Sequence, residues 1–410
     1  MSVYLFATLD TKGREAQFLR ERLEAAGARV TLVDVGSLKP PVCPADISRA
    51  QVFAAAGVDP AELTKAGDRG AAVAAATAGA AALCKLHHAE GRVSGVLAIG
   101  GSAGSTIGSA AMRALPLGVP KLLVSTVASG QVRHYVGDKD IFMLNAVVDI
   151  SGLNRVSRAV LDQAARAMAG MVTLPTAPAA EEDRPLVAAS MFGVTTPCVE
   201  QARQVLEAAG YEVLVFHATG NGGLAMESLV TDGLLAGVLD ITTTELADEL
   251  VGGMFTAGPD RLLAAARAGV PQVVSVGATD MVNFHARNTV PERFADRKFH
   301  QHNASVTLMR TTPAENTQLG QEIGRKLADA RGPVAIFLPA RGVSAIDRAG
   351  EPFDDPTARQ ALFAGIRATA GPTEIVEMDC HINDAEFATA AARKLIEMIE
   401  QQAARDKLGL

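Results

Sequence analysis

Glycine and hydroxyl residues are concentrated directly after one short apolar run of this chain. The run is Val96–Ile99, and the residues that follow it are Gly100, Gly101, Ser102, Ala103, Gly104, Ser105 and Thr106. Glycines allow backbone N–H groups to approach a phosphate closely, and the hydroxyls offer further donors. The spacing fits neither a Walker A loop nor the GxGxxG dinucleotide fingerprint. The segment indicates an anion or phosphate site, with close packing of a strand against a helix as the alternative.

Two other segments of the first half have similar chemistry. Val3–Leu9 is followed by Asp10, Thr11, Lys12 and Gly13, and Lys121–Val124 is followed by a segment that includes Ser129 and Gly130. Lys12 brings a positive charge to the start of a helix, which suits an anionic ligand, although a solvated lysine on a capped helix is the alternative. Because the carboxyl ends of parallel strands share one edge of a sheet, we expect one polar rim that binds phosphate.

Acidic and histidine side chains occupy the corresponding places in the second half. The catalytic candidates are Asp240, Glu245 and His381. Asp240 lies near the end of a predicted strand and Glu245 in the first turn of the predicted helix, where acids also interact favourably with the helix dipole. His381 could serve as an acid or base because the ordinary pKa of imidazole is near neutrality, or it could only orient a turn.

A His-x-His pair raises the question of a metal. Lys298–Met309 alternates in polarity, so His300 and His302 are expected on one face of a strand. Two histidines can be metal ligands, but the spacing shows no third. The four cysteines are scattered without a CxxC pair, which argues against a Cys-based zinc site and against a disulfide framework. We therefore assign no metal site.

Short apolar runs alternate with helical patterns along the whole chain. Besides the runs named above, they are Val30–Val35, Val187–Met191, Val213–Phe216, Val238–Ile241, Gln272–Val276, Val334–Leu338 and Glu374–Met378. Runs of this kind, bounded by Gly or Pro, predict buried strands of a mainly parallel sheet with helices on both faces. The expected fold class is α/β, with Rossmann-like, doubly wound architecture.

Three sequence markers occur in the same order in both halves. Leu23–Gly27 recurs as Leu206–Gly210, Gly95–Leu97 as Gly237–Leu239, and Gly118–Pro120 as Gly269–Pro271. An ordered set of this kind predicts duplication of a domain. The Pro- and Ala-rich stretch near residue 180 predicts a linker. We therefore expect an N-terminal lobe at 1–175, a linker at 176–185, a C-terminal lobe at 186–410, and a ligand cleft between the lobes.

The composition excludes several classes of function. The net charge of -7 offers no basic field for a nucleic acid, and the absence of Trp removes a stacking residue. No apolar stretch reaches about 18 residues and the N-terminus has no basic n-region, so we expect neither a membrane span nor a secretory signal. The expected setting is the cytoplasm.

Several longer motifs resemble the UPF0261 family, also known as the Tm-1-like ATP-binding family. They include Ala7–Gly13, Gly100–Gly104, Lys121–Gly130, Asp149–Arg155, Met191–Pro197, Phe216–Gly220, Gly237–Glu249, Val306–Thr312 and His381–Asp384. The resemblance covers residues 2 to 400 and implies a two-domain Rossmann-like fold, ATP binding with Mg as a possible companion, and a homodimer. A TIM-barrel extension known in the family is not expected here.

The resemblance also implies which residues bind the nucleotide. They are Asp10, Thr11, Lys12, Gly100, Gly101, Ser102, Gly104, Ser105, Thr106, Ser129 and Gly130. The family's GGSGGT pattern has Ala103 in place of a glycine and Ser105 in place of the threonine here, and the Cβ of Ala103 could hinder close approach of the backbone.

Three hypotheses for the function stay open. The chain is a nucleotide-binding enzyme that acts on a small polar substrate, or an isomerase, hydrolase or lyase acting on a phosphorylated or carboxylate metabolite with ATP incidental. The third hypothesis is a nucleotide-gated binding protein without turnover. The expected partners are a nucleotide and a small polar metabolite, not a nucleic acid or a membrane.

Overall fold

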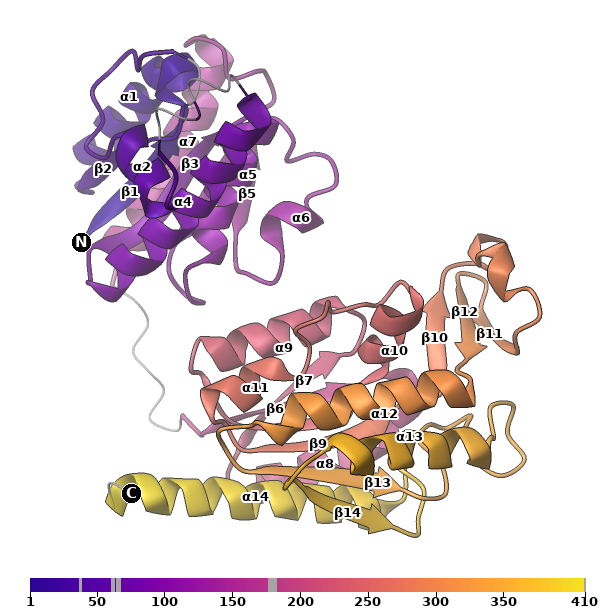
Figure 1. Cartoon of the computed structure of the whole chain (residues 1–410). Helices are drawn as coiled ribbons and strands as arrows, with labels where there is room; N and C mark the ends of the chain where they lie inside the picture. The colour runs from indigo at the N-terminus through magenta and orange to yellow at the C-terminus, as the bar shows by residue number, and fades with distance from the viewer. Residues whose placement is uncertain (37–38, 60–62, 64–67, 176–182, 409–410) are drawn as a thin grey trace. The chain divides into compact units, whose positions relative to one another are not determined.

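The structure, a computed structural model, describes residues 1–36, 39–59, 63, 68–175 and 183–408. The chain forms two compact units, which we call the N-terminal unit (Met1–Ala179) and the C-terminal unit (Ala180–Leu410). Each unit has its own parallel sheet with helices around it (Figure 1). Of the predicted linker at 176–185, residues 176–182 lie outside the described part of the chain.

A five-stranded parallel sheet forms the centre of the N-terminal unit, in the order β2-β1-β3-β4-β5. The strands are β1 (Ser2–Ala7), β2 (Val30–Asp34), β3 (Val93–Gly100), β4 (Lys121–Ser125) and β5 (Phe142–Asn145). The helices are α1 (Leu9–Ala25), α2 (Arg49–Ala55), α4 (Arg69–Ala89), α5 (Ser102–Arg113), α6 (Arg133–Val136) and α7 (Arg155–Thr173). Val3 and Leu5 pack towards α1 and α7, whereas Tyr4 and Phe6 pack towards α2, α4 and α5. Both faces of the sheet are therefore buried.

The C-terminal unit has a six-stranded parallel sheet in the order β14-β13-β9-β8-β6-β7. Its strands are β6 (Leu186–Met191), β7 (Glu212–His217), β8 (Leu235–Thr242), β9 (Gln272–Gly277), β13 (Val334–Pro339) and β14 (Glu374–Met378). The helices are α8 (Thr196–Ala208), α9 (Asn221–Thr231), α10 (Thr244–Val251), α11 (Leu263–Ala268), α12 (Pro313–Ala328), α13 (Pro356–Thr369) and α14 (Ala385–Leu408), and short 3₁₀ turns cover Gly193–Thr195, Arg287–Thr289 and Glu292–Phe294. One face of the sheet packs on α8 and α14. The other face packs on α12 and α13, which lie side by side (Figure 1).

A small antiparallel sheet projects from the C-terminal unit. It consists of β10 (Met281–Phe284), β11 (Phe299–Asn303) and β12 (Val306–Arg310), in the order β10-β12-β11. The alternating segment Lys298–Met309 is therefore a hairpin and not one strand, because a turn at Ala304 and Ser305 reverses the chain. Alternation of polarity continues through a tight turn, so it does not reveal where one strand ends and the next begins.

The two parallel sheets repeat one topology. Reading β7-β6-β8-β9-β13 against β2-β1-β3-β4-β5 gives the same strand order, with β14 as an addition. The register shifts at the same place in both: between Ser2 and Val3 in the pairing of β1 with β3, and between Leu186 and Val187 in the pairing of β6 with β8. The shifts lie opposite Gly95 and Gly237, one of the duplicated markers. The predicted α/β fold with two related Rossmann-like lobes is confirmed.

Helix α4 is long and apolar enough to cross a membrane, judged by length and composition alone. Its residues Ala76, Ala80 and Leu83 are buried among the α2 and sheet residues of the N-terminal unit. A Cβ at Gly79 would overlap the carbonyl of Val52, so α4 lies directly on α2. This packing accounts for the apolar residues on the buried face of α4.

Candidate functional site

The sheet order of the N-terminal unit places a topological switch point between β1 and β3, where ligands of open α/β sheets bind. A cavity of about 250 Å³ lies at this point. Its walls are Thr8, Asp10, Thr11, Lys12, Val35, Arg69, Val73, Gly100, Gly101, Ser102, Ala103, Gly104, Ile107 and Asp149. Seven of the eleven residues predicted to bind the nucleotide are therefore brought together at one cavity.

The N-terminus of α5 forms one wall of this cavity. Gly101 is the N-cap residue, and within the described residues no side chain caps this helix end. The first N–H groups of a helix have no partner inside the helix, and the helix dipole gives this end a partial positive charge. This end of α5 is therefore suited to an anion.

The glycines before and within α5 have two different roles. A Cβ at Gly100 would lie 2.7 Å from the Cα of Gly104, and a Cβ at Gly104 would lie 2.9 Å from the carbonyl oxygen of Ile99. These two glycines are required for packing of α5 on β3. A Cβ at Gly101 meets only the Thr126 hydroxyl at 3.5 Å, an ordinary contact, so Gly101 is free of that constraint and faces the cavity.

Four of the residues predicted to bind the nucleotide lie elsewhere. The Ser105 hydroxyl is buried and lies 2.6 Å from that of Ser125, and the Thr106 hydroxyl donates to the Ser102 carbonyl. Both residues belong to α5, because the helix starts at Ser102 and its winding turns these side chains away from the cavity. Ser129 and Gly130 are exposed and do not line this cavity.

The segment Asp10–Gly13 lies inside a helix. Helix α1 starts at Leu9, and Lys12 has non-helical backbone angles inside it. The Lys12 ammonium donates to the carbonyl of Ile150, and the backbone N–H of Gly152 donates to Glu15. The loop 149–152 is thereby attached to α1. Asp10 accepts a hydrogen bond from the backbone of Lys39.

Sequence reasoning missed several residues of the cavity. Arg69 begins α4, Asp149 lies in the loop attached to α1, and the side chains of Val35, Val73 and Ile107 form its apolar part. Asp149 belongs to one of the family-like motifs, which was a usable signal. No motif or spacing distinguishes Arg69, because it lies far along the chain from the ends of β1 and β3 that carry the predicted residues.

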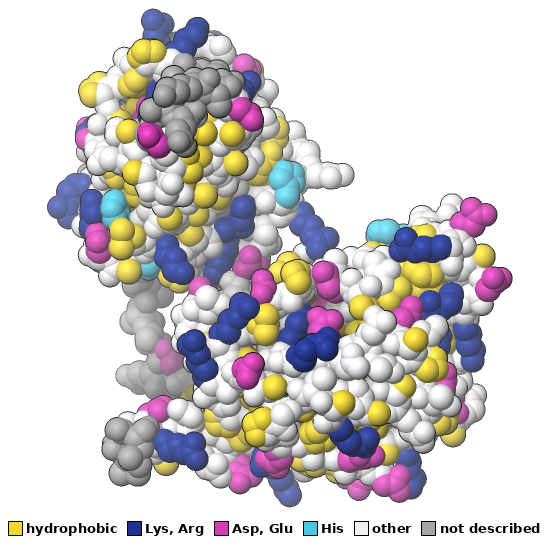
Figure 2. Space-filling view, viewed as in Figure 1, with side chains coloured by type: hydrophobic (Ala, Val, Ile, Leu, Met, Phe, Trp, Pro, Cys, Tyr) yellow, Lys and Arg dark blue, Asp and Glu magenta, His cyan; other side chains and the backbone are white. Residues whose placement is uncertain are grey.

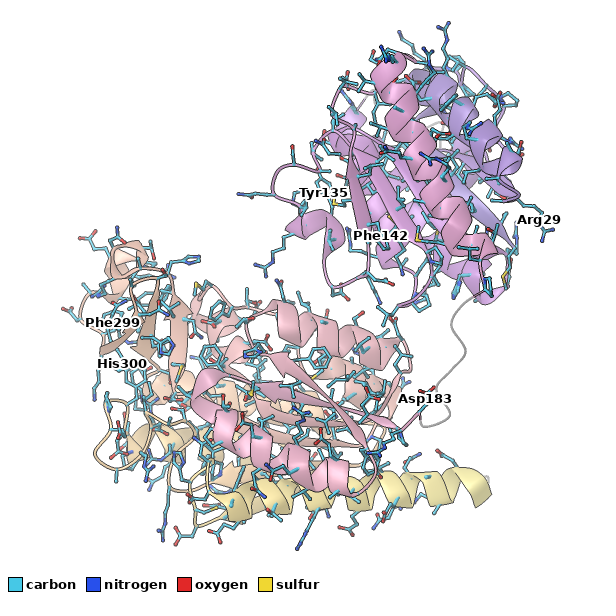
Figure 3. All side chains as sticks on the ribbon, turned by 180° about the vertical axis from the view of Figure 1, so that it is seen from behind. Arg29, Tyr135, Phe142, Asp183, Phe299 and His300 are labelled. Atoms are coloured by element: carbon cyan, nitrogen blue, oxygen red, sulfur yellow. The ribbon has the colours of Figure 1, made fainter. Side chains whose placement is uncertain are left out.

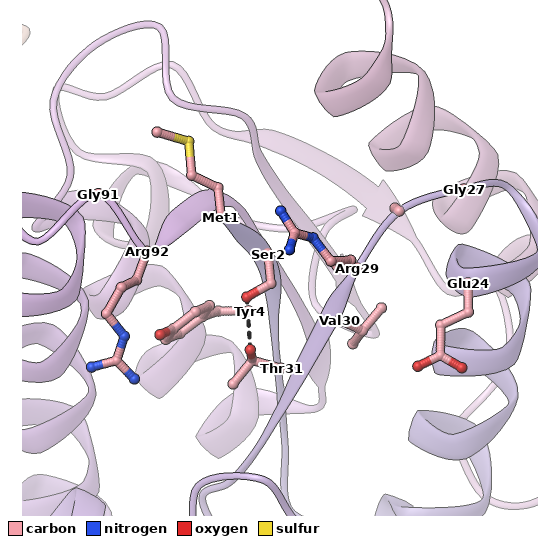
Figure 4. A pocket seen from close by; sticks show the side chains of 11 residues that line it. Met1, Ser2, Tyr4, Glu24, Gly27, Arg29, Val30, Thr31, Gly91 and Arg92 are labelled. Atoms are coloured by element: carbon pink, nitrogen blue, oxygen red, sulfur yellow. Dashed lines mark hydrogen bonds between the residues drawn. The ribbon is translucent and has the colours of Figure 1, made fainter.

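A second hollow of the N-terminal unit lies at the opposite edge of the sheet (Figure 4). It has a volume of about 640 Å³ and is formed where β1, β2 and β3 begin. Its floor includes Ser2 and Thr31, whose hydroxyls lie 2.7 Å apart, and its rim includes Arg29 and Arg92. Ligands of open α/β sheets bind at the carboxyl ends of the strands, so this hollow is the less favourable candidate.

In the C-terminal unit, Asp240 and Glu245 meet around a buried arginine. The guanidinium of Arg261 donates to Asp240 at 2.7 Å, to Glu245 at 2.7 Å and to Glu227 at 3.2 Å. Asp240 also accepts from the Ser190 hydroxyl. Arg261 was not among the predicted residues, because a single arginine outside any motif gives no signal in the sequence. The carboxylates of Asp240 and Glu245 thus both accept hydrogen bonds from Arg261 in the interior of the unit.

Glu245 also occupies a helix N-terminus of its own unit. Its carboxylate accepts from the backbone N–H groups of Gly220 and Gly223, at the start of α9. Burial raises the pKa of Glu245, and the charge of Arg261 opposes that effect. The anion-binding end of α9 is therefore filled by a side chain of this protein.

The switch point of the C-terminal unit lies between β6 and β8. The hydroxyls of Thr195 and Thr242 lie 2.8 Å apart there, and both residues are completely buried. Thr244, which corresponds to Ser102 at the start of the helix, is buried as well. The place that is an open cavity in the N-terminal unit is thus closed by threonines in the C-terminal unit.

His381 lies at the end of β14, apart from the Arg261 cluster. Its Nδ1 accepts from the backbone N–H of Asn383, and its Nε2 lies 2.8 Å from the carbonyl oxygen of Ser344. Burial lowers the pKa of His381. These contacts fit a neutral imidazole that orients two loops, and the structure does not bring His381 together with Asp240 and Glu245. The catalytic role of these three residues stays a prediction.

Two further buried carboxyls have raised pKa values. Burial raises the pKa of Asp248 to about 7, against hydrogen bonds from the Asn283 backbone and amide. Burial and the neighbouring Asp347 raise the pKa of Asp280 to about 7. Over the described part of the chain, one carboxyl oxygen of Asp280 and the amide oxygen of Asn283 are buried without a hydrogen-bond partner.

The predicted histidine pair lies on β11, and Figure 3 labels His300 beside Phe299 on the small sheet. The His300 ring packs edge-on against Phe353, whereas His302 is exposed. Within the described residues, three potential metal ligands come together elsewhere, at Cys380, Asp384 and Glu386. Burial raises the pKa of Cys380 to about 11, which opposes the thiolate that a metal needs.

The surface of the C-terminal unit visible in Figure 2 carries Lys, Arg, Asp and Glu side chains interspersed with one another. Such mixing gives no extended field of one sign. The face of the C-terminal unit seen in this view therefore shows no extended basic patch.

A solved structure that resembles the chain is that of the glycosyltransferase SnogD from Streptomyces nogalater. It aligns over 97% of this chain and 100% of that chain, with 13% identity and a TM-score of 0.18. A likeness this distant carries no argument about the site.

Comparisons of sequence are far more specific. The N-terminal domain of the uncharacterised protein family UPF0261 matches residues 1–177, and its C-terminal domain matches residues 184–399. The chain is 48% identical over 401 residues to a UPF0261 protein of Clostridium tetani, covering 97% of this chain and 99% of that protein. It is 40% identical over 418 residues to the ToMV resistance protein Tm-1 of Solanum lycopersicum, covering 97% of this chain but 55% of Tm-1. The chain therefore belongs to the UPF0261 family.

Proposed function

We propose that the N-terminal unit binds the phosphates of a nucleotide of the ATP type at the cavity between β1 and β3. The observation that carries the proposal is the uncapped N-terminus of α5, which opens into a cavity at the switch point of the sheet. The corresponding place in the C-terminal unit is closed by Thr195 and Thr242. Within the described residues, we therefore assign the nucleotide to the N-terminal unit and not to the corresponding place in the C-terminal unit.

The residues of the cavity suit a nucleotide with its metal. Arg69 supplies positive charge for phosphate, and Asp10 and Asp149 supply the carboxylate oxygens that Mg²⁺ prefers. The side chains of Val35, Val73 and Ile107 add apolar surface. A volume of about 250 Å³ is slightly below the range of about 300–1,000 Å³ that is usual for ligand pockets. It accommodates phosphates and part of a sugar, so the rest of the ligand extends out of the cavity.

The same volume favours a second candidate, a small phosphorylated metabolite. Such a ligand would place its phosphate at α5 and its polar groups near Asp10 and Asp149, without a base. Titration with ATP and with sugar phosphates discriminates between the two. Heat with ATP and none with the sugar phosphates supports the first, and the reverse supports the second.

Replacing Gly101 with aspartate tests the proposal directly. The new carboxylate would cap α5 and accept the N–H groups that we assign to phosphate. We expect ATP affinity in isothermal titration to fall by more than about 100-fold, because two like charges about 4 Å apart repel by about 4 kcal/mol at an effective dielectric of 20. We also expect the unfolding free energy to stay equal or rise by a few tenths of a kcal/mol, roughly.

Two matched variants separate charge from volume at this position. Gly101→Ala adds a methyl group that the structure accommodates, so it should change affinity little. Gly101→Asn caps the helix without charge and should fall between the alanine and aspartate variants. Equal affinity in the wild type and Gly101→Asp would refute the assignment of phosphate to α5.

A further inference from the structure

Two positively charged side chains line the cavity, and they are placed differently. Lys12 lies within α1 and is half-buried, whereas Arg69 is the first residue of α4 and is exposed. Asp10 and Asp149 offset their charge. Binding of a phosphate in this cavity therefore depends on which of the two cationic side chains is available to contact it.

Lys12 already has a structural partner. Its ammonium donates to the carbonyl of Ile150, a buried residue of the loop 149–152. Glu15, one turn further along α1, accepts from Gly152 of the same loop. The break in helical angles at Lys12 accompanies this attachment. The ammonium of Lys12 is thus used to hold one wall of the cavity.

Arg69 has no such partner. Within the described residues its guanidinium forms no hydrogen bond and no ion pair, although it lines the cavity. The N-terminal N–H groups of α4 are satisfied by Asp68, which accepts from Gly70 and Ala71. The only unused donors that α4 brings to this cavity, among the residues that the structure describes, are those of Arg69.

The position of Arg69 is electrostatically unfavourable without a ligand. A cation in the first turn of a helix interacts with the positive end of the dipole, which costs about 0.3–1 kcal/mol. Asp68 offsets part of this cost. An anion bound at the adjacent N-terminus of α5 would interact favourably with the guanidinium, which presents several N–H donors in a planar fork that matches phosphate oxygens.

We infer that Arg69 is the side chain that binds the phosphate of the ligand, and that Lys12 is a positioning residue for the loop 149–152. The inference rests on the proposed phosphate site and adds the residue that sets its preference for anions. Arg69 and the α5 N–H groups approach the phosphate from two different elements. A ligand without phosphate loses both contacts.

The test titrates the full chain with ATP, tripolyphosphate and adenosine. Arg69→Gln should weaken binding of ATP and of tripolyphosphate about 10- to 100-fold, the range for a lost charge-assisted hydrogen bond, with an unchanged or slightly raised Tm. The matched control is Arg155→Gln, because Arg155 is exposed and begins α7 as Arg69 begins α4, but does not line the cavity. Lys12→Gln should speed amide hydrogen exchange of the loop 149–152 without any ligand.

The outcomes separate this inference from the proposed function. Wild-type binding of ATP that Arg69→Gln leaves unchanged overturns the role of Arg69 alone. Binding of tripolyphosphate that depends on Arg69, without any binding of ATP, supports the role of Arg69 and overturns the nucleotide. Failure of the wild type to bind either phosphate compound overturns both. Unchanged hydrogen exchange of the loop in Lys12→Gln overturns the positioning role of Lys12.

Discussion

Replacing Arg261 with methionine should lower the unfolding free energy of the C-terminal unit by about 3–5 kcal/mol, the range for removing one partner of a buried ion pair. Arg261 is completely buried and donates to Asp240, Glu245 and Glu227. Methionine fills a similar volume but leaves three carboxylates close together without a compensating charge. Urea denaturation followed by circular dichroism measures the change.

The control for this prediction is Arg267→Met, six residues further along the chain. Arg267 pairs with Asp260 on the surface, where both side chains are mostly exposed. Exposed pairs contribute about 0–1 kcal/mol, so this variant should be close to the wild type. If Arg261→Met lowers the unfolding free energy by no more than Arg267→Met does, the hydrogen bonds of the buried cluster do not stabilise the unit.

The stability of the C-terminal unit should decrease as the pH rises from 4 to 8. Asp248 and Asp280 have pKa values of about 7 in the folded chain, against an ordinary value of 3.8. A carboxyl whose pKa is raised by folding stabilises the fold fully below its unfolded pKa, and this contribution is lost as the pH rises through the folded pKa. Each carboxyl accounts for up to about 4 kcal/mol over this interval.

Asp248→Asn isolates one of the two groups. An amide resembles the protonated carboxyl and does not ionise, so the unfolding free energy of this variant should fall less steeply between pH 4 and pH 7, by about 1.4 kcal/mol per pH unit at most. Asp260→Asn removes an exposed carboxyl of the same unit and should leave the wild-type slope unchanged. Parallel pH curves for the wild type and Asp248→Asn would contradict a protonated Asp248.

The pattern of apolar runs was sufficient for the fold class. Strands buried on both faces consist of consecutive apolar residues, as in Val3–Ala7 and Val96–Ile99, and such runs are visible without any tertiary information. The duplicated markers were informative for the same reason, since Gly95 and Gly237 lie at the same register shift of the two sheets. Edge strand β5 was missed because it is short and its Phe142 is exposed.

The candidate site was predicted only in part. Residues close in sequence to the strand ends, such as Lys12 and Gly101, were found because parallel strands end at one edge of the sheet. Ser105 and Thr106 were predicted to bind the nucleotide, but the winding of α5 turns their side chains into the unit and along the helix. Arg69 was missed because chain folding alone brings the start of α4 to the ends of β1 and β3.

The glycine- and hydroxyl-rich segment after Val96–Ile99 thus shows what the sequence determined by itself. Its composition and its place after a strand predicted a phosphate-binding edge, because these depend on local backbone chemistry. Only the tertiary structure decided that the N-terminus of α5 is left without a side-chain cap in the N-terminal unit. In the C-terminal unit, the carboxylate of Glu245 occupies the N-terminus of α9. Whether a helix end is open depends on side chains that are distant in the sequence, and their approach is decided by packing.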